Sequence, residues 1–120
     1  MNLKDNTVKI ENLNPKIRKV LDLLDILWSV LYPNDADGLN VTSGHEETAK
    51  HKETSKHYIW NCASEMGEAF DVRTKDVEQY KAHLTCTLLW IVSVLRFNTM
   101  LKIYPEALLT ENAHIHVELM

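Results

Sequence analysis

Two stretches of the sequence decide the fold, because each alternates in the manner of a β-strand. They are Gly67-Glu68-Ala69-Phe70-Asp71-Val72-Arg73 and His114-Ile115-His116-Val117-Glu118-Leu119. Successive side chains of a strand point to opposite faces of a sheet. In the first stretch Phe70 and Val72 therefore face one way, and Asp71 faces the other. In the second, the apolar residues face one way, and the two histidines and the glutamate face the other. Each strand is expected to bury an apolar face and to present a polar one.

A helix and a short strand are predicted before the first of these stretches. Asn14-Pro15 is typical of an N-cap followed by proline at the first helical position. Apolar residues then recur with helical spacing at Ile17, Val20, Leu21, Leu24, Leu27, Trp28 and Leu31. Pro33-Asn34 and Asp37-Gly38 end this helix, and residues 39–44 are expected to form a short strand.

A second helix is predicted after Thr74, which is expected to cap it. Its core-facing side is predicted to be the stripe of Val77, Tyr80, Leu84, Leu88, Ile91 and Leu95. Pro105 marks the next break, and residues 107–110 and 114–119 are read as a final strand or hairpin. This order predicts one α+β domain over residues 1–120, a small antiparallel sheet with helices packed on one face. Residues 1–13 are expected to be a loose arm or a short edge element.

Composition argues against nucleic acid as a partner and against insertion into a membrane. The 120 residues carry 13 basic and 17 acidic side chains, which are interspersed, so a nucleic-acid partner is not expected. Because no run approaches the roughly 20 apolar residues of a spanning helix, membrane insertion is not expected either. The N-terminus lacks the apolar region of a secretory signal, which predicts synthesis in the cytoplasm. Cys62 and Cys86 are expected to be free thiols, and the chain is expected to be a monomer.

Three local features together indicate a metal site. They are Ser55-Lys56-His57-Tyr58 in a polar loop, Gly67 to Asp71 on one strand, and His114 to Glu118 on another. Any one histidine taken singly is more often a surface or capped side chain, so the prediction rests on the set. Zinc favours about four nitrogen, oxygen or sulfur ligands, and two imidazoles with one carboxylate leave a position open for water. The small residues on the face of Asp71 are expected to leave space for a metal.

The order Ser-x-His, Gly-x-Ala-x-Asp and His-x-His-x-Glu resembles the zinc D-Ala-D-Ala carboxypeptidase and phage endolysin peptidase family. That family is grouped with lysostaphin-type enzymes and the hedgehog signalling domain, and the resemblance runs from about Val41 to Glu118. It implies a Zn²⁺ site in a cleft on the sheet, with peptidoglycan stem peptide as substrate. The ligands that it implies are His57, Asp71 and His116. It further implies that Ser55 orients the loop of the first ligand, that His114 lies beside the metal, and that Glu118 fixes a ligand.

The sequence departs from the family pattern at the general base. Ala113 stands three residues before the last ligand, where the family places an Asp or Glu that takes a proton from the metal-bound water. Either Glu111 or His114 has taken that role, or the chain is a catalytically impaired form. An alanine introduced deliberately would look the same.

Two further departures concern the cleft. The gap between His57 and Asp71 is longer than in the family, and the extra residues 59–66 form either a flap carrying Trp60 or an insertion packed on the core, the latter being preferred. No arginine follows the Ser43-Gly44 segment to polarise the substrate carbonyl. Lys50 or His51 is expected to substitute, and His51 is the better candidate.

The favoured prediction is a zinc peptidase that cleaves a D-Ala-D-Ala or an L-Ala-D-Glu bond. A phage endolysin released to the cell wall and a bacterial enzyme acting on wall fragments both fit. The alternatives are a non-catalytic zinc-binding or wall-binding module with the same fold, and a metal-free interaction domain.

Overall fold

The computed structural model describes residues 1–45, 56–57, 59 and 66–120. In the part of the chain so described there are two α-helices, α1 (Pro15–Leu31) and α2 (Ala82–Phe97), and a short 3₁₀ helix, Gln79–Lys81, just before α2. The strands are β1 (Asn2–Leu3), β2 (Asn40–Ser43), β3 (Ala69–Arg73), β4 (Leu101–Glu106) and β5 (His114–Leu119).

The five strands form one mixed sheet in the order β1-β2-β3-β5-β4. The pairs β2–β3, β3–β5 and β4–β5 are antiparallel, whereas β1 lies parallel to β2. An antiparallel sheet is what the sequence predicts, but β4 is not among the predicted strands. The N-terminal residues are thus partly a short edge element, which is one of the two expected alternatives. The sheet is mixed only because this two-residue strand joins it.

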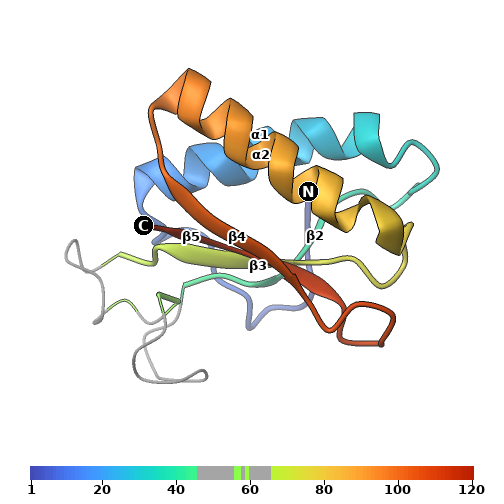
Figure 1. Ribbon diagram of the computed structural model, residues 1–120. Helices are drawn as coiled ribbons and strands as arrows, with labels where there is room; N and C mark the ends of the chain where they lie inside the picture. The colour runs from blue at the N-terminus through green and yellow to red at the C-terminus, as the bar shows by residue number, and fades with distance from the viewer. Residues whose placement is uncertain (46–55, 58, 60–65) are drawn as a thin grey trace.

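Both helices pack on the same face of the sheet, so the α+β prediction is confirmed (Figure 1). The hydroxyls of Tyr32 and Thr85 lie 2.7 Å apart and link the two helical segments. Apolar residues of both helices and of the inner sheet face form the core, among them Ile17, Leu21, Leu24, Trp28, Phe70, Val72, Leu89, Ile115 and Val117. No described helix has both the length and the apolar character that a membrane span requires.

Helix α1 has the limits and the buried face that the sequence predicts. The Asn14 side chain accepts a hydrogen bond from the backbone N–H of Lys16 at 2.9 Å, and Pro15 occupies the first helical position. The residues that face the sheet are those of the predicted stripe from Ile17 to Trp28. Capping and periodicity are local properties, which is why the sequence predicts this helix well.

Helix α2 departs from the prediction in its start and in its buried face. The backbone N–H of Thr74 donates to the carbonyl of Ala113, extending the β3–β5 ladder, and α2 begins only at Ala82. Thr74 therefore does not cap the helix. The predicted apolar stripe is largely exposed, whereas the buried residues are mostly small, namely Ala82, Thr85, Cys86, Leu89 and Ser93. Small side chains allow α2 to lie close to its neighbours.

The C-terminal hairpin also differs from its prediction. Pro105 lies inside β4 rather than at a break, and a proline is tolerated there because β4 is an edge strand. Residues 107–110, predicted as strand, belong to the connecting loop, where Ala107 and Leu109 have positive φ.

Cys86 is buried and carries a free thiol, as predicted, and burial raises its pKa to about 11. Cys62 lies outside the described residues.

Candidate metal centre

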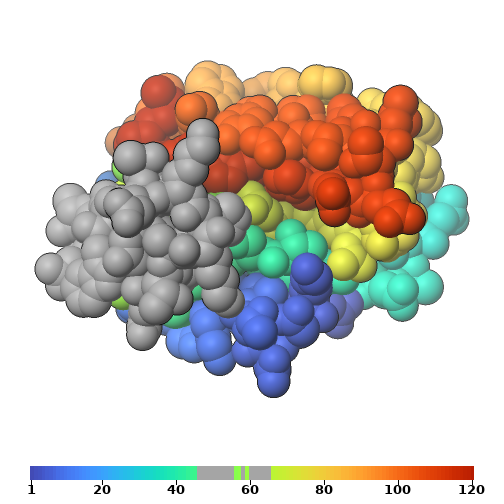
Figure 2. All heavy atoms as spheres, turned by 90° about the horizontal axis from the view of Figure 1, so that it is seen from below, coloured from blue at the N-terminus to red at the C-terminus, as the bar shows by residue number. Residues whose placement is uncertain are grey.

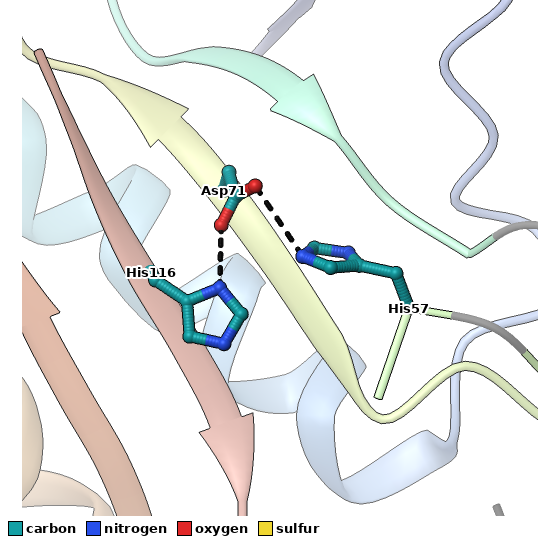
Figure 3. A group of neighbouring side chains, drawn as sticks. All are labelled: His57, Asp71 and His116. Carbon is teal, nitrogen blue, oxygen red and sulfur yellow. Dashed lines mark hydrogen bonds and ion pairs between the residues drawn. The ribbon is translucent and has the colours of Figure 1, made fainter. Parts of the chain in front are cut away.

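Asp71 and His116 are brought together by strand register. The antiparallel pairing of β3 with β5 places Asp71 directly opposite His116. Their neighbours Phe70, Val72, Ile115 and Val117 point into the core, so the two polar side chains share the sheet face that the helices leave uncovered. The Nδ1 of His116 lies 2.7 Å from Oδ1 of Asp71 (Figure 3).

His57 reaches the same carboxylate from the segment that precedes β3. Its side chain is almost completely buried, and its Nε2 lies 3.3 Å from Oδ2 of Asp71. The ring centroids of His57 and His116 are 5.2 Å apart, and each ring faces a different oxygen of Asp71 (Figure 3). The structure thus brings all three predicted ligands together.

Each histidine is held through the ring nitrogen that points away from the cluster. Nδ1 of His57 lies 2.8 Å from the Gly44 carbonyl, and Nε2 of His116 lies 3.2 Å from Oε1 of Glu118. In His116 the inner Nδ1 also faces a carboxylate, that of Asp71, so both ring nitrogens donate to carboxylates, and a metal would have to displace the inner proton. The outer nitrogen of each histidine donates its N–H to a carbonyl or carboxylate oxygen. This is the arrangement that metal-ligating histidines use, and it gives Glu118 the supporting contact expected of it.

Gly44 permits the bond that holds His57. A Cβ at this position would lie 1.9 Å from the carbonyl oxygen of Lys9, so only glycine allows the N-terminal segment to pass this close. The backbone N–H of His45 donates to that same Lys9 carbonyl at 2.9 Å. At Gly67, by contrast, a Cβ would lie 2.4 Å from Cβ of His45. The space beside Gly67 is thus taken by His45 rather than left for a metal.

The charges of the cluster stabilise one another. Burial raises the pKa of Asp71, but hydrogen bonds and charge from His116 and His57 outweigh it and hold this pKa far below the usual range of a carboxyl group. Burial lowers the pKa of His116, yet the contacts with Asp71 and Glu118 outweigh it and raise this pKa above its ordinary value. The carboxylate is therefore ionised and ready to act as a ligand at neutral pH.

These three side chains form a buried group that can hold a metal ion. The candidate ligand atoms all lie within 4.8 Å of one another. Two imidazole nitrogens and one carboxylate oxygen suit zinc and other transition metals, and three protein ligands leave a coordination position open. The donor set and its buried, oriented geometry therefore fit the group that the sequence predicts.

A cleft of about 460 Å³ reaches this cluster at Asp71. Its walls come from the N-terminal segment, from β2 and β3, and from the loop before β5, on the face seen in Figure 2. The residues that line it are Lys4, Thr7, Val8, Thr42, Ser43, Gly44, His45, Asp71, Arg73, Glu111, Asn112, Ala113 and His114.

Ala113, at the position of the family's base, and the two candidates that could replace that base occupy different places in this cleft. Glu111 is exposed at its wall. Ala113 is 2% exposed, and its carbonyl accepts from Thr74. His114 is held within its own hairpin, with Nδ1 2.7 Å from the Asn112 carbonyl and Nε2 3.2 Å from a Glu106 oxygen. His114 lines the cleft but does not belong to the cluster of ligands.

Sequence reasoning missed three residues near the centre. Arg73 and Lys4 line the cleft. They are cations that could take the place of the arginine that the family has and this sequence lacks. Arg73 follows Asp71 by two residues, so strand alternation alone could have placed it on the same face. Tyr104 pairs with His116 across β4 and β5, and their ring centroids are 5.0 Å apart. No signal pointed to Tyr104, because β4 was not predicted.

Several predicted positions fall outside the described residues, namely Lys50, His51, Ser55 and Trp60. Of the residues 59–66 assigned to a flap or an insertion, Ile59 is buried and Met66 is partly buried.

No protein-family model matches the chain, and no curated protein matches it. Inference about function therefore depends on the site itself.

Proposed function

We propose that the chain is a zinc-dependent peptidase that hydrolyses stem peptides of peptidoglycan. The observation that carries the proposal is the cluster of His57, Asp71 and His116, whose ligand atoms converge within 4.8 Å from three separate segments. Buried histidines with their outer nitrogens held by hydrogen bonds are typical of metal centres. The choice of peptidoglycan rests on the resemblance of the three sequence motifs to zinc D-Ala-D-Ala peptidases.

The side chains of the cleft suit hydrolysis of a peptide that carries carboxylates. Zinc held by this donor set supplies a Lewis acid and a water whose pKa falls from about 15.7 toward 7. Glu111, exposed at the wall of the cleft, is the proposed proton acceptor in place of the missing carboxylate at Ala113. Arg73 and Lys4 are proposed to hold a carboxylate or the scissile carbonyl of the substrate.

The first experiment tests the metal. The purified chain, stripped and then titrated with zinc, is expected to bind about one ion per chain. His116→Ala and Asp71→Asn are expected to abolish tight binding. His114→Ala is the matched control, because His114 lies on the same strand but outside the cluster, and it should retain the metal. Zinc binding that is equally lost in the His114 and His116 variants would contradict the assigned ligands.

The second experiment tests catalysis. Zinc-loaded protein is incubated with purified cell walls and with peptides containing D-Ala-D-Ala or L-Ala-D-Glu, and products are identified by mass spectrometry. Glu111→Gln is expected to abolish cleavage without loss of zinc, whereas Ala113→Asp and Ala113→Glu test whether the family base can be restored. Protein that holds zinc but cleaves none of these substrates in any of these forms would refute the peptidase proposal.

The second candidate is a non-catalytic zinc-binding or wall-binding module, which the nature of position 113 favours. Ala113 cannot move a proton, and its side chain is buried. Such a module is expected to co-sediment with insoluble cell walls in a zinc-dependent manner and to release no peptide from them. Co-sedimentation without product, in assays where a zinc peptidase used as a positive control is active, would support this candidate.

A further inference from the structure

Tyr104, on the edge strand β4, lies against the last of the three candidate ligands. Strand β5 lies between β3 and β4, so His116 has Asp71 opposite it on one side and Tyr104 opposite it on the other. Side chains at directly paired positions of a sheet share one face, so all three lie on the face that the helices leave open. The ring centroids of Tyr104 and His116 are 5.0 Å apart, and the ring planes are inclined by 33°. This contact is closer to a stacked than to an edge-on arrangement.

The hydrogen bonds of His116 leave the tilt of its ring weakly determined. Its Nδ1 lies 2.7 Å from Asp71 and its Nε2 lies 3.2 Å from Glu118. These bonds determine which ring atoms face the two carboxylates. They resist tilting of the ring plane only weakly, because carboxylate oxygens accept hydrogen bonds over a broad range of directions. A metal bound at Nδ1 would replace the bond to Asp71, so that Glu118 alone of these two contacts would still hold the ring.

The tyrosine ring restricts the motion that these hydrogen bonds allow. If the imidazole tilted toward Tyr104 the two rings would clash, and if it tilted away their van der Waals contact would be lost. Tyr104 is itself well placed for this, because it is partly buried and its strand is paired with β5 from Leu101 to Glu106. The ring of Tyr104 is therefore a fixed surface against which the plane of the His116 ring is set.

Tyr104 lies on the side of the cluster that is remote from the cleft. In the part of the chain that the structure describes, the lining of the cleft reaches Asp71 but includes neither His116 nor Tyr104. The strand order β2-β3-β5-β4 places Asp71 next to the cleft and Tyr104 beyond His116. An effect of Tyr104 on the site is therefore expected to act through His116 and not through contact with a peptide in the cleft.

We propose that Tyr104 is a positioning residue of the metal centre, whose ring sets the tilt of the His116 imidazole and so the direction of Nδ1. Glu118 and Tyr104 then act on different motions of the same ring, since Glu118 selects the edge that faces Asp71 and Tyr104 fixes the plane. The proposal rests on the proposed metal centre, but it does not depend on peptidase activity. Residues that hold a ligand without contacting the metal typically change metal affinity by about 10- to 100-fold when they are replaced.

Metal affinity and ligand geometry in three variants test the proposal. Zinc affinity is measured by competition with a chromophoric chelator, and Co²⁺ is bound in place of zinc so that its visible absorption reports the geometry of the ligands. Tyr104→Val, which keeps a residue that favours strands, should bind zinc about tenfold more weakly and change the cobalt spectrum. Tyr104→Phe keeps the ring and should match the wild type in both. Tyr80→Val is the matched control, since Tyr80 is 79% exposed on the 3₁₀ helix before α2, and it should also match the wild type.

Urea unfolding of the same chains in EDTA separates positioning from a purely structural role. If Tyr104→Val binds zinc more weakly only to the extent that it unfolds more easily, and its cobalt spectrum is unchanged, Tyr104 merely stabilises the sheet and the proposal is overturned. Unchanged affinity and spectrum in Tyr104→Val would overturn it as well. If Tyr104→Phe is as weak as Tyr104→Val, the hydroxyl group and not the ring is responsible, which also contradicts the proposal. A wild-type chain that binds neither ion would instead refute the metal centre itself.

Discussion

At the scale of single residues, the metal centre depends on the bonds that hold the outer nitrogens of its histidines. Glu118 accepts from His116 at 3.2 Å, and the Gly44 carbonyl accepts from His57 at 2.8 Å. These contacts fix the orientation of the two rings before a metal binds, which lowers the free-energy cost of metal binding. Residues that do not contact the metal should therefore still affect the affinity of the site for zinc.

Glu118→Ala should weaken zinc binding by about 10- to 100-fold, because His116 loses the acceptor that orients it. Glu118→Gln should weaken zinc binding less, since the amide oxygen of the glutamine can still accept from Nε2 of His116. Competition with a chromophoric chelator measures both constants. If Gln weakens binding as much as Ala, the negative charge of Glu118 rather than its orienting bond is what matters.

Arg73 is expected to act on substrate and not on the metal. It lines the cleft, and its ion pair with the exposed Asp76 is long, at 4.0 Å, and contributes little to stability. Arg73→Gln should therefore raise KM for a carboxylate-bearing peptide by roughly tenfold. This factor corresponds to the loss of about 1.4 kcal/mol, close to what one charge-assisted hydrogen bond contributes. Zinc content should be unchanged, and a parallel loss of zinc would argue that Arg73 is structural.

At the scale of elements, the approach of the N-terminal segment to the end of β2 positions the first ligand. Gly44→Ala would force Lys9 or the Gly44 carbonyl to move, because the added Cβ would lie 1.9 Å from the Lys9 oxygen. We expect both lower stability and weaker zinc binding. Gly38→Ala is the comparison, since Gly38 has φ +75° but open space around it.

Gly38→Ala should cost about 1 kcal/mol through backbone strain and leave zinc affinity unchanged. Urea unfolding and chelator competition on the two variants separate these effects. Equal zinc affinities in the two would show that the Gly44 bond to His57 does not matter for the metal.

At the scale of the whole molecule, metal binding and folding are linked. The stability of the metal-free chain and its affinity for zinc are expected to change with pH in opposite directions. In the metal-free chain the raised pKa of His116 contributes stability that is present below the unfolded pKa of about 6.5 and is lost as pH rises through the folded value. Zinc instead competes with protons for both histidines, so its binding strengthens as pH rises.

The melting temperature of the metal-free chain should thus decrease as the pH is raised from 6 to 8.5. The increase in melting temperature that excess zinc produces should become larger over the same pH range. At a zinc concentration 100-fold above the dissociation constant, the gain is about 2.7 kcal/mol. Thermal unfolding with EDTA or with zinc at both pH values measures this. A zinc-dependent gain that is larger at pH 6 than at pH 8.5 would contradict histidine ligation.

Features that depend on neighbouring residues could be predicted without the structure. Helix α1, its Asn14 cap, and the alternation of β3 and β5 follow from local patterns, and the resemblance of three motifs to a known family implied His57, Asp71 and His116 as ligands. Features that depend on contacts between distant residues required the folded structure. The pairing register sets Asp71 opposite His116, and the core selects the small-residue side of α2 over its larger aliphatic side. Periodicity shows that a face is apolar, but packing against other elements determines which of two apolar faces is buried.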